Sequence, residues 1–182
     1  EYLDAIAGVA VTSLGHANPE IASALAEQAD VLLHTTNMFR IPWQEQLGER
    51  LCRLSGMERA FFCNSGAEAN EAALKLARLH ATARNVAQPQ VLVMENSFHG
   101  RTLATLAATG NPAVHRGFEP LMPGFIRVPY DDIEAVRQVA ANSPNVVAVL
   151  VEPVQGEGGV HPASAGYLQA LRQLCDAHDW LM

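Results

Sequence analysis

Lysine is nearly missing from this sequence of 182 residues: Lys75 is the only one. Basic charge is low as a whole, because 12 Lys and Arg residues face 19 Asp and Glu residues, for a net charge of −7 at pH 7. A chain without a basic patch cannot replace the counterions of a polyanion, so no nucleic-acid partner is expected. Long apolar runs are also missing. None approaches the ~20 residues that a membrane-spanning helix needs, so no membrane partner is expected either.

Cysteine is scarce, and the three cysteines do not form a recognisable set. Cys52, Cys63 and Cys175 are widely spaced, odd in number and without a CxxC pair. This arrangement favours reduced thiols and a cytoplasmic location, with each cysteine acting as a small buried apolar residue. The first residues lack the basic and apolar regions of a secretory signal peptide. No metal site is predicted.

Hydrophobic residues are abundant, at 49%, and they recur in alternating strand and helix patterns that indicate a globular α/β protein. The first part of the chain is expected to contain an extended segment or a small hairpin over 2–14, a helix from Pro19 to about Leu33 with Asn18 as N-cap, and a helix from Pro42 that ends at Gly56. The later part is expected to contain strands over 59–63, 90–94, 125–128 and 146–151, and helices over 67–80, 102–108, 132–141 and 164–178. This order predicts a mostly parallel sheet with helices on both faces. Residues 1–55 are interpreted as a segment that leads into the large domain, and residues 56–182 as an incomplete part of that domain.

Ligands of parallel α/β sheets bind beyond the carboxyl ends of the strands, so the residues after each strand matter most. After the first predicted strand, Ser65 and Glu68 form a capping-box pattern that marks a helix N-terminus. The backbone amides of Gly66 and Ala67 would be free to bind an anion such as a phosphate. The alternative is a helix that is simply well capped.

Two further segments follow later strands. Phe98 could stack on a flat ring and Arg101 could pair with a carboxylate or phosphate, although a core phenylalanine beside a surface arginine is an equal alternative. Glu152 directly follows the apolar run 146–151, so it faces either the site or a solvated edge. Glu157 lies in a glycine-rich turn. Neither a dinucleotide fingerprint nor a P-loop is present, which counts against a nucleotide-binding domain.

The three segments after the strands, in this order, resemble the class III pyridoxal-phosphate aminotransferases. The resemblance is carried by residues 64–71, 98–102 and 151–157, with further similarity at 15–19 and 34–37. Within that family, Phe98-His99-Gly100-Arg101-Thr102 is most similar to the acetylornithine and succinylornithine aminotransferases, followed by the ornithine aminotransferases. The resemblance implies a fold-type I enzyme, in which a large α/β domain and a smaller domain bind pyridoxal 5′-phosphate at a homodimer interface.

The same resemblance implies roles for individual residues. Ser65, Gly66 and Ala67 would bind the cofactor phosphate, and Phe98 would stack on its pyridine ring. Arg101 would bind the α-carboxylate of the amino-acid substrate.

Two acidic residues would complete the substrate site. Glu157 resembles the family's gate glutamate, which moves to admit 2-oxoglutarate. Glu152 would line the substrate site without a defined role, and His99 is not expected to take part in the chemistry.

One departure from the family pattern concerns the lysine that transamination requires. Lys75 lies about two turns into a predicted helix, where a solvated surface position is expected. The family's catalytic lysine and its C-terminal small domain come later in the chain, so the sequence is interpreted as an N-terminal fragment that is inactive alone. The expected reaction of the full-length protein moves the amino group of N-acetylornithine to 2-oxoglutarate, as in arginine biosynthesis. Ornithine, succinylornithine or 4-aminobutyrate as amino donor, or a truncated non-catalytic protein, are the alternatives.

Overall fold

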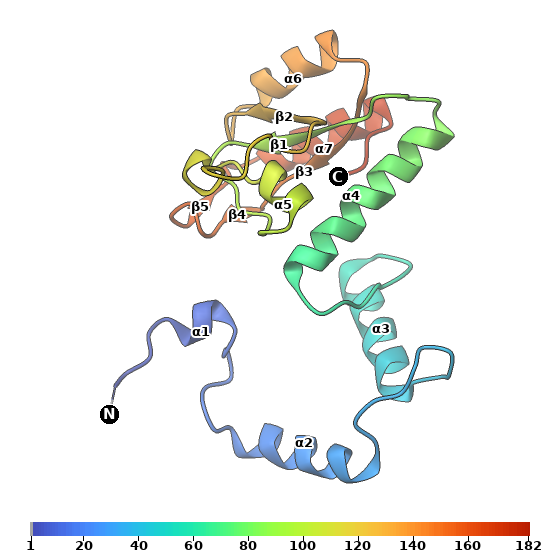
Figure 1. Ribbon diagram of the computed structural model, residues 1–182, viewed down its shortest axis with the longest axis vertical. Coiled ribbons are helices and arrows are strands. Elements are labelled where there is room, and N and C mark those ends of the chain that lie inside the picture. The colour runs from blue at the N-terminus through green and yellow to red at the C-terminus, as the bar shows by residue number, and fades with distance from the viewer. Residues whose placement is uncertain (1) are drawn as a thin grey trace. The chain divides into compact units, whose positions relative to one another are not determined.

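A computed structural model describes residues 2–182, which form two compact units (Figure 1). The first unit ends at Ala60 and the second comprises Phe61–Met182.

The first unit contains two regular helices, α2 (Pro19–Val31) and α3 (Pro42–Ser55). The Asn18 side chain accepts hydrogen bonds from two backbone N–H groups in the first turn of α2, at 3.0 and 3.2 Å. Helix α3 ends at Gly56, whose φ of 73° places it in the left-handed region that glycine adopts easily. Both helices confirm the predictions made from proline and capping residues.

The segment before α2 forms neither the predicted extended segment nor a small hairpin. Residues Ala7–Ala10 form a short turn, α1, in which all four residues have positive φ. The Asp4 carboxylate accepts hydrogen bonds from the backbone N–H groups of Ile6 and Ala7, at 3.0 and 2.9 Å. Aspartate that bonds to nearby backbone groups competes with extended structure, and this local interaction explains why the prediction from β-branched residues was wrong.

The second unit is built on a parallel sheet of three strands, β1 (Gln90–Met94), β2 (Phe125–Val128) and β3 (Val146–Leu150). Their spatial order is β2-β1-β3, so β1 is central. Leu181 continues the sheet by a parallel bridge to Ala148. The strands predicted over 90–94, 125–128 and 146–151 and their parallel arrangement are confirmed.

Helices cover both faces of this sheet (Figure 1). One face packs against α6 (Ile133–Asn142) and α7 (Tyr167–His178), and the other against α4 (Gly66–Ala83) and α5 (Leu103–Ala108). The central strand serves both apolar clusters, because alternate side chains point to opposite faces. The members from β1 are Leu92 and Met94 on the first face and Val91 and Val93 on the second. The α/β fold with helices on both faces is therefore confirmed.

Three features around this sheet differ from the prediction. Residues 59–63 form no strand, and the Phe61 side chain is 73% exposed. The prediction rested on apolarity, but a strand also needs a hydrogen-bonding neighbour, and none is present for this segment within residues 2–182. Conversely, the short antiparallel pair β4 (Val154–Gln155) and β5 (His161–Pro162) was not predicted. Helix α7 begins three residues later than expected, after Gly166 in a left-handed conformation.

The three cysteines occupy different environments, and all are free thiols. Cys175 is buried, in agreement with the prediction, whereas Cys52 is half-buried and Cys63 is exposed. Among the described helices, none has the length and apolarity required to cross a membrane.

Candidate functional site

A cavity of about 210 Å³ lies beyond the carboxyl ends of β1 and β3, in the second unit. It contains three of the residues selected from the sequence, Phe98, Arg101 and Glu157. The full lining consists of Asn96, Ser97, Phe98, Arg101, Asn111, Val114, Glu157 and Gly158. Two loops that are far apart in the sequence therefore meet at this position, as expected for neighbouring parallel strands.

Phe98 and Arg101 form one side of this cavity. The guanidinium carbon of Arg101 lies 5.8 Å from the centroid of the Phe98 ring. The Phe98 side chain is half-buried and Arg101 is exposed. An aromatic face and a cation are thus available to the same ligand, which suits a flat, anionic molecule.

The loop of Phe98 packs against the beginning of α4. The Asn70 side chain donates a hydrogen bond of 2.8 Å to the carbonyl oxygen of His99. Gly100 has a φ of 135°, and an added Cβ would lie 2.9 Å from the Cβ of Ala67. Because only glycine allows this approach, the loop and the N-terminus of α4 lie close together.

The N-terminus of α4 has the geometry of an anion site. The Ser65 hydroxyl accepts a hydrogen bond of 3.2 Å from the backbone N–H of Glu68. The Glu68 carboxylate accepts from the backbone N–H of Asn64, at 2.6 Å, rather than from that of Ser65 as the capping-box pattern predicts. The amides of Gly66 and Ala67, in the first turn, have no intrahelical acceptor, and no heavy atom lies within 4 Å of a Cβ added at Gly66. An anion could approach these amides closely.

Glu152 connects the loop of Phe98 with the turn that contains Glu157. Its carboxylate accepts a hydrogen bond of 2.8 Å from the backbone N–H of Phe98 and one of 3.2 Å from that of Gly156. The Gln155 side chain adds a second connection by donating to the carbonyl oxygen of Glu95, at 2.8 Å. Glu152 is half-buried and is not among the residues that line the cavity.

His99 is buried, with 4% of its surface exposed, and its Nε2 has no hydrogen-bond partner within the described residues. Burial lowers the pKa of His99, while the negative charge of Glu152 acts in the opposite direction. The imidazole is therefore neutral at pH 7. Its backbone N–H donates to the Thr109 hydroxyl at 3.0 Å, so His99 also supports the loop conformation.

Asn111 and Val114 line the cavity but were not selected from the sequence. They belong to the chain that follows α5, where Pro112–Val114 form a short 3-10 helix, η1. The Asn111 side chain accepts a hydrogen bond of 3.0 Å from the backbone N–H of Ala113. The dipeptide Asn111-Pro112 is a turn signal, and this was the only local indication that the chain folds back here.

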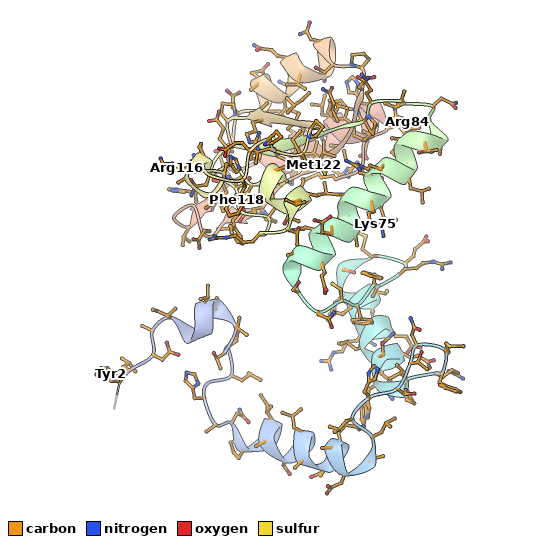
Figure 2. All side chains as sticks on the ribbon, viewed as in Figure 1. Tyr2, Lys75, Arg84, Arg116, Phe118 and Met122 are labelled. Carbon is orange, nitrogen blue, oxygen red and sulfur yellow. The ribbon has the colours of Figure 1, made fainter. Side chains whose placement is uncertain are left out.

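The single lysine lies away from this cavity. Lys75 is exposed on α4, and its label in Figure 2 marks its position on that helix. A flexible, solvated ammonium group on a helix surface has no role in this cavity.

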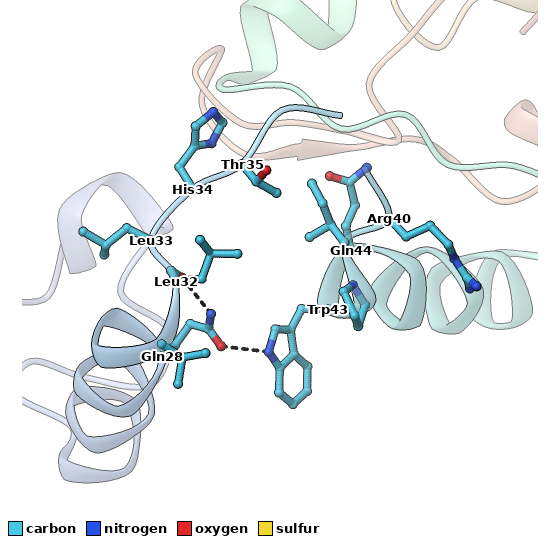
Figure 3. Close-up of a pocket in the computed structure, with 11 residues that line it drawn as sticks. Gln28, Leu32, Leu33, His34, Thr35, Arg40, Trp43 and Gln44 are labelled. Carbon is cyan, nitrogen blue, oxygen red and sulfur yellow. Dashed lines mark hydrogen bonds between the residues drawn. The ribbon is translucent and has the colours of Figure 1, made fainter. Parts of the chain in front are cut away.

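The first unit contains a separate hollow of about 490 Å³ between the end of α2 and the beginning of α3 (Figure 3). His34 and Thr35, from one of the motifs near the start of the chain, lie in its lining. The Trp43 indole N–H donates to the Gln28 side-chain oxygen at 2.9 Å, which joins the two helices.

Comparison with known proteins identifies one family. The family model for "Aminotransferase class-III" matches residues 1–182. An acetylornithine aminotransferase of Nitrosomonas europaea is 58% identical over 181 residues, and an acetylornithine aminotransferase of Prochlorococcus marinus is 48% identical. Each match covers all of this chain. The chain spans only 46% and 45% of the lengths of these two relatives.

Solved structures show the same similarity. The ornithine aminotransferase of Toxoplasma gondii superposes on 99% of the chain with a TM-score of 0.92 and 35% identity, and the matched part is 44% of that structure. The N-acetylornithine aminotransferase of Stenotrophomonas maltophilia superposes on 97% of the chain with a TM-score of 0.78 and 38% identity, and the matched part is 43% of that structure.

Proposed function

The chain belongs to the class III aminotransferases, and we propose on this basis that the whole protein transfers the amino group of N-acetylornithine to 2-oxoglutarate, with pyridoxal 5′-phosphate as cofactor. When bound, this cofactor supplies the electron sink and carries the amino group between the two substrates. We place the reaction in the cytoplasm, where the three free thiols stay reduced.

The observation that carries the proposal is the meeting of Phe98, Arg101 and Glu157 around one cavity, at the carboxyl end of the sheet. Arg101 would bind the α-carboxylate of the amino acid through its planar guanidinium group. Glu157, on the opposite loop, would face the distal part of the substrate. These roles require a ligand that is flat at one end and anionic at the other.

The residues present fit the cofactor. The beginning of α4 offers the unpaired amides of Gly66 and Ala67, next to the hydroxyl of Ser65, for a phosphate group. Phe98 is half-buried, and its ring would stack on the pyridine ring and exclude water from that face. The contact between Gly100 and Ala67 keeps these two elements together.

The lysine that transamination requires is not provided by these residues, because Lys75 is exposed on α4. We assign that role to a lysine in the part of the whole protein beyond Met182. The 182 residues expressed alone would bind substrate and cofactor groups weakly and would not transaminate.

The test is a comparison of amino donors with the purified full-length protein. N-Acetylornithine, ornithine, N-succinylornithine and 4-aminobutyrate are each supplied with 2-oxoglutarate, and glutamate formation is followed. A kcat/KM for N-acetylornithine at least about tenfold above the other donors, or roughly 1.4 kcal/mol of discrimination, is expected. A higher value for any other donor would identify a different class III enzyme.

Ornithine is the second candidate donor. It is favoured by the close structural similarity to an ornithine aminotransferase, which has a TM-score of 0.92. The two donors differ only in the acetyl group, so the same assay separates them directly.

We also propose that the whole protein is a homodimer. No side chain of residues 2–60 is fully buried, and large apolar side chains of α2 and α3, such as Leu25 and Trp43, are 66% and 65% exposed. An apolar surface of this kind needs cover, and the family arrangement supplies it from a second copy. Sedimentation equilibrium of the full-length protein should give twice the monomer mass, and a monomer at micromolar concentration would contradict the proposal.

A further inference from the structure

The carboxylate of Glu152 joins two loops that both contribute residues to the cavity lining. One oxygen accepts from the backbone N–H of Phe98, at 2.8 Å, and the other accepts from that of Gly156, at 3.2 Å. Phe98 lines the cavity directly, and Gly156 precedes Glu157, which also lines it. One side chain thus contacts the backbone at both loops.

We propose that Glu152 is a positioning residue that sets the separation between the Phe98 loop and the Glu157 turn, and that it does not bind the substrate itself. The identity of the substrate and cofactor in this cavity rests on the proposed aminotransferase function. The positioning role of Glu152 rests on its two hydrogen bonds.

The chemistry of the two partners explains why a carboxylate is suited to this position. Both partners are N–H donors, and an ionised carboxylate offers only acceptors. Glutamine at the same position could accept from one N–H, but its NH₂ group would face the other donor. Charge-assisted hydrogen bonds of this kind are also about twice as strong as neutral ones.

Among the residues that the structure describes, no cation forms an ion pair with this carboxylate. The ion pairs of the described residues do not include Glu152. His99 is neutral, and Tyr130 donates its hydroxyl to the backbone carbonyl oxygens of Glu152 and Pro153 rather than to the carboxylate. The two backbone N–H groups are therefore the partners that stabilise the charge.

The other connections between the loops lie next to this one. The Gln155 side chain bonds to the Glu95 carbonyl oxygen, and a Cβ added at Gly158 would lie 2.8 Å from the Asn96 carbonyl oxygen. These contacts also join the two loops, but neither involves the backbone N–H of Phe98 or of Gly156. Loss of Glu152 should therefore loosen the two loops and leave the sheet intact.

Hydrogen exchange of the full-length protein without cofactor tests this inference. The variant is Glu152→Gln, and the matched control is Glu95→Gln, which makes the same charge change on an exposed side chain at the end of β1. Peptides that cover residues 96–101 and 155–160 should exchange about tenfold faster in Glu152→Gln than in the control. Peptides from β2 and α6 should exchange at the same rate in both variants.

Two results would overturn the proposal. One is unchanged exchange in either loop, because the carboxylate would then not hold both. The other is faster exchange throughout the sheet, because Glu152 would then contribute to general stability. If Glu152→Gln does not fold, Glu152→Asp, which keeps the charge but has a shorter reach, must show the same local effect, and normal exchange in that variant would also count against the proposal.

The loaded enzyme provides a second measurement. Glu152→Gln should lose cofactor during dialysis about tenfold faster than Glu95→Gln, since the Phe98 ring is no longer held in place. Equal retention in the two variants would contradict the positioning role. A full-length protein that lacks transaminase activity but shows the local exchange effect would disprove the proposed function and leave the positioning role intact.

Discussion

The guanidinium carbon of Arg101 lies 5.8 Å from the centroid of the Phe98 ring, so the residue proposed to bind the substrate also contacts the residue proposed to hold the cofactor. A cation over an aromatic face contributes about 0.5–1 kcal/mol at an exposed position. This is smaller than the roughly 1.5–3 kcal/mol expected from losing a hydrogen bond to a charged carboxylate. The two roles can therefore be separated by single substitutions.

Replacement of Arg101 should affect the substrate. In the full-length enzyme, Arg101→Ala should raise the KM for the amino donor about tenfold to hundredfold, because charged hydrogen bonds contribute roughly 1.5–3 kcal/mol each. The absorption spectrum of the bound cofactor should not change. Arg116→Ala, at an exposed arginine outside the cavity, is the control. An unchanged KM in Arg101→Ala would remove this residue from the substrate site.

Replacement of Phe98 should affect the cofactor. Phe98→Ala should weaken cofactor binding by about 0.5–1.5 kcal/mol beyond the loss of buried area, since aromatic stacking is removed. Fluorescence titration of the apoenzyme with cofactor measures this change. Phe118→Ala, at a phenylalanine that is 61% exposed and outside the cavity, should bind the cofactor normally. Equal affinities in the two variants would argue against stacking.

Gly100 should tolerate no side chain. A Cβ added there would lie 2.6 Å from the Thr105 hydroxyl oxygen and 2.9 Å from the Ala67 Cβ, at a φ of 135°. Gly117→Ala is a control with a positive φ of 87° but no heavy atom within 4 Å of the new Cβ. Urea unfolding should show a loss of about 1–2 kcal/mol for the control, from backbone strain, and about 1–3 kcal/mol more for Gly100→Ala, from overpacking. Equal losses would mean that the loop and α4 are not in contact.

Cys175 should make the protein less stable at alkaline pH. Burial raises the pKa of this thiol from 9.0 to about 11, so between these values the unfolded state releases a proton that the folded state retains. The free energy of unfolding therefore falls as the pH rises through this window, by roughly 1 kcal/mol between pH 8 and pH 10 from this group alone. Cys175→Ala should show a smaller decline in urea unfolding over this range, whereas Cys63→Ala, at an exposed thiol, should match the parent. A parallel decline in all three proteins would refute the assignment.

The parts of the fold that could be predicted are those that local sequence determines. The strands Gln90–Met94 and Phe125–Val128 are observed with the predicted bounds, because short apolar runs between turn residues seldom form helices. Asn18, Ser65 and Asp132 act as helix caps through their side chains, as their residue types indicate. In contrast, residues 59–63 are also mostly apolar but form no strand. A strand must form hydrogen bonds with a neighbouring strand, and the sequence of the segment itself does not show whether such a neighbour is present.

The candidate site shows the same division. The positions of Phe98, Arg101 and Glu157 around one cavity follow from the rule that loops after parallel strands meet at one edge of the sheet. The position of Asn111 in the cavity lining could not be predicted. The dipeptide Asn111-Pro112 indicates a turn, but it does not show that this turn brings Asn111 to the cavity. The backbone partners of Glu152 could not be predicted either. Every residue except proline has a backbone N–H group, so the sequence does not show which of them bonds to this carboxylate.

The central position of β1 has a consequence for synthesis of the chain on the ribosome. Val91 pairs with Phe125 on one side and with Ala148 on the other, so the apolar strand emerges long before its second neighbour. At translation rates of about 5–20 residues per second, several seconds pass before Ala148 follows Val91 out of the exit tunnel. During this interval the edge of β1 that later pairs with β3 is open to molecular chaperones. Slow codons between these two strands would lengthen the exposure, and a nascent chain stalled before β3 should be bound by such chaperones more strongly than one stalled after Leu181.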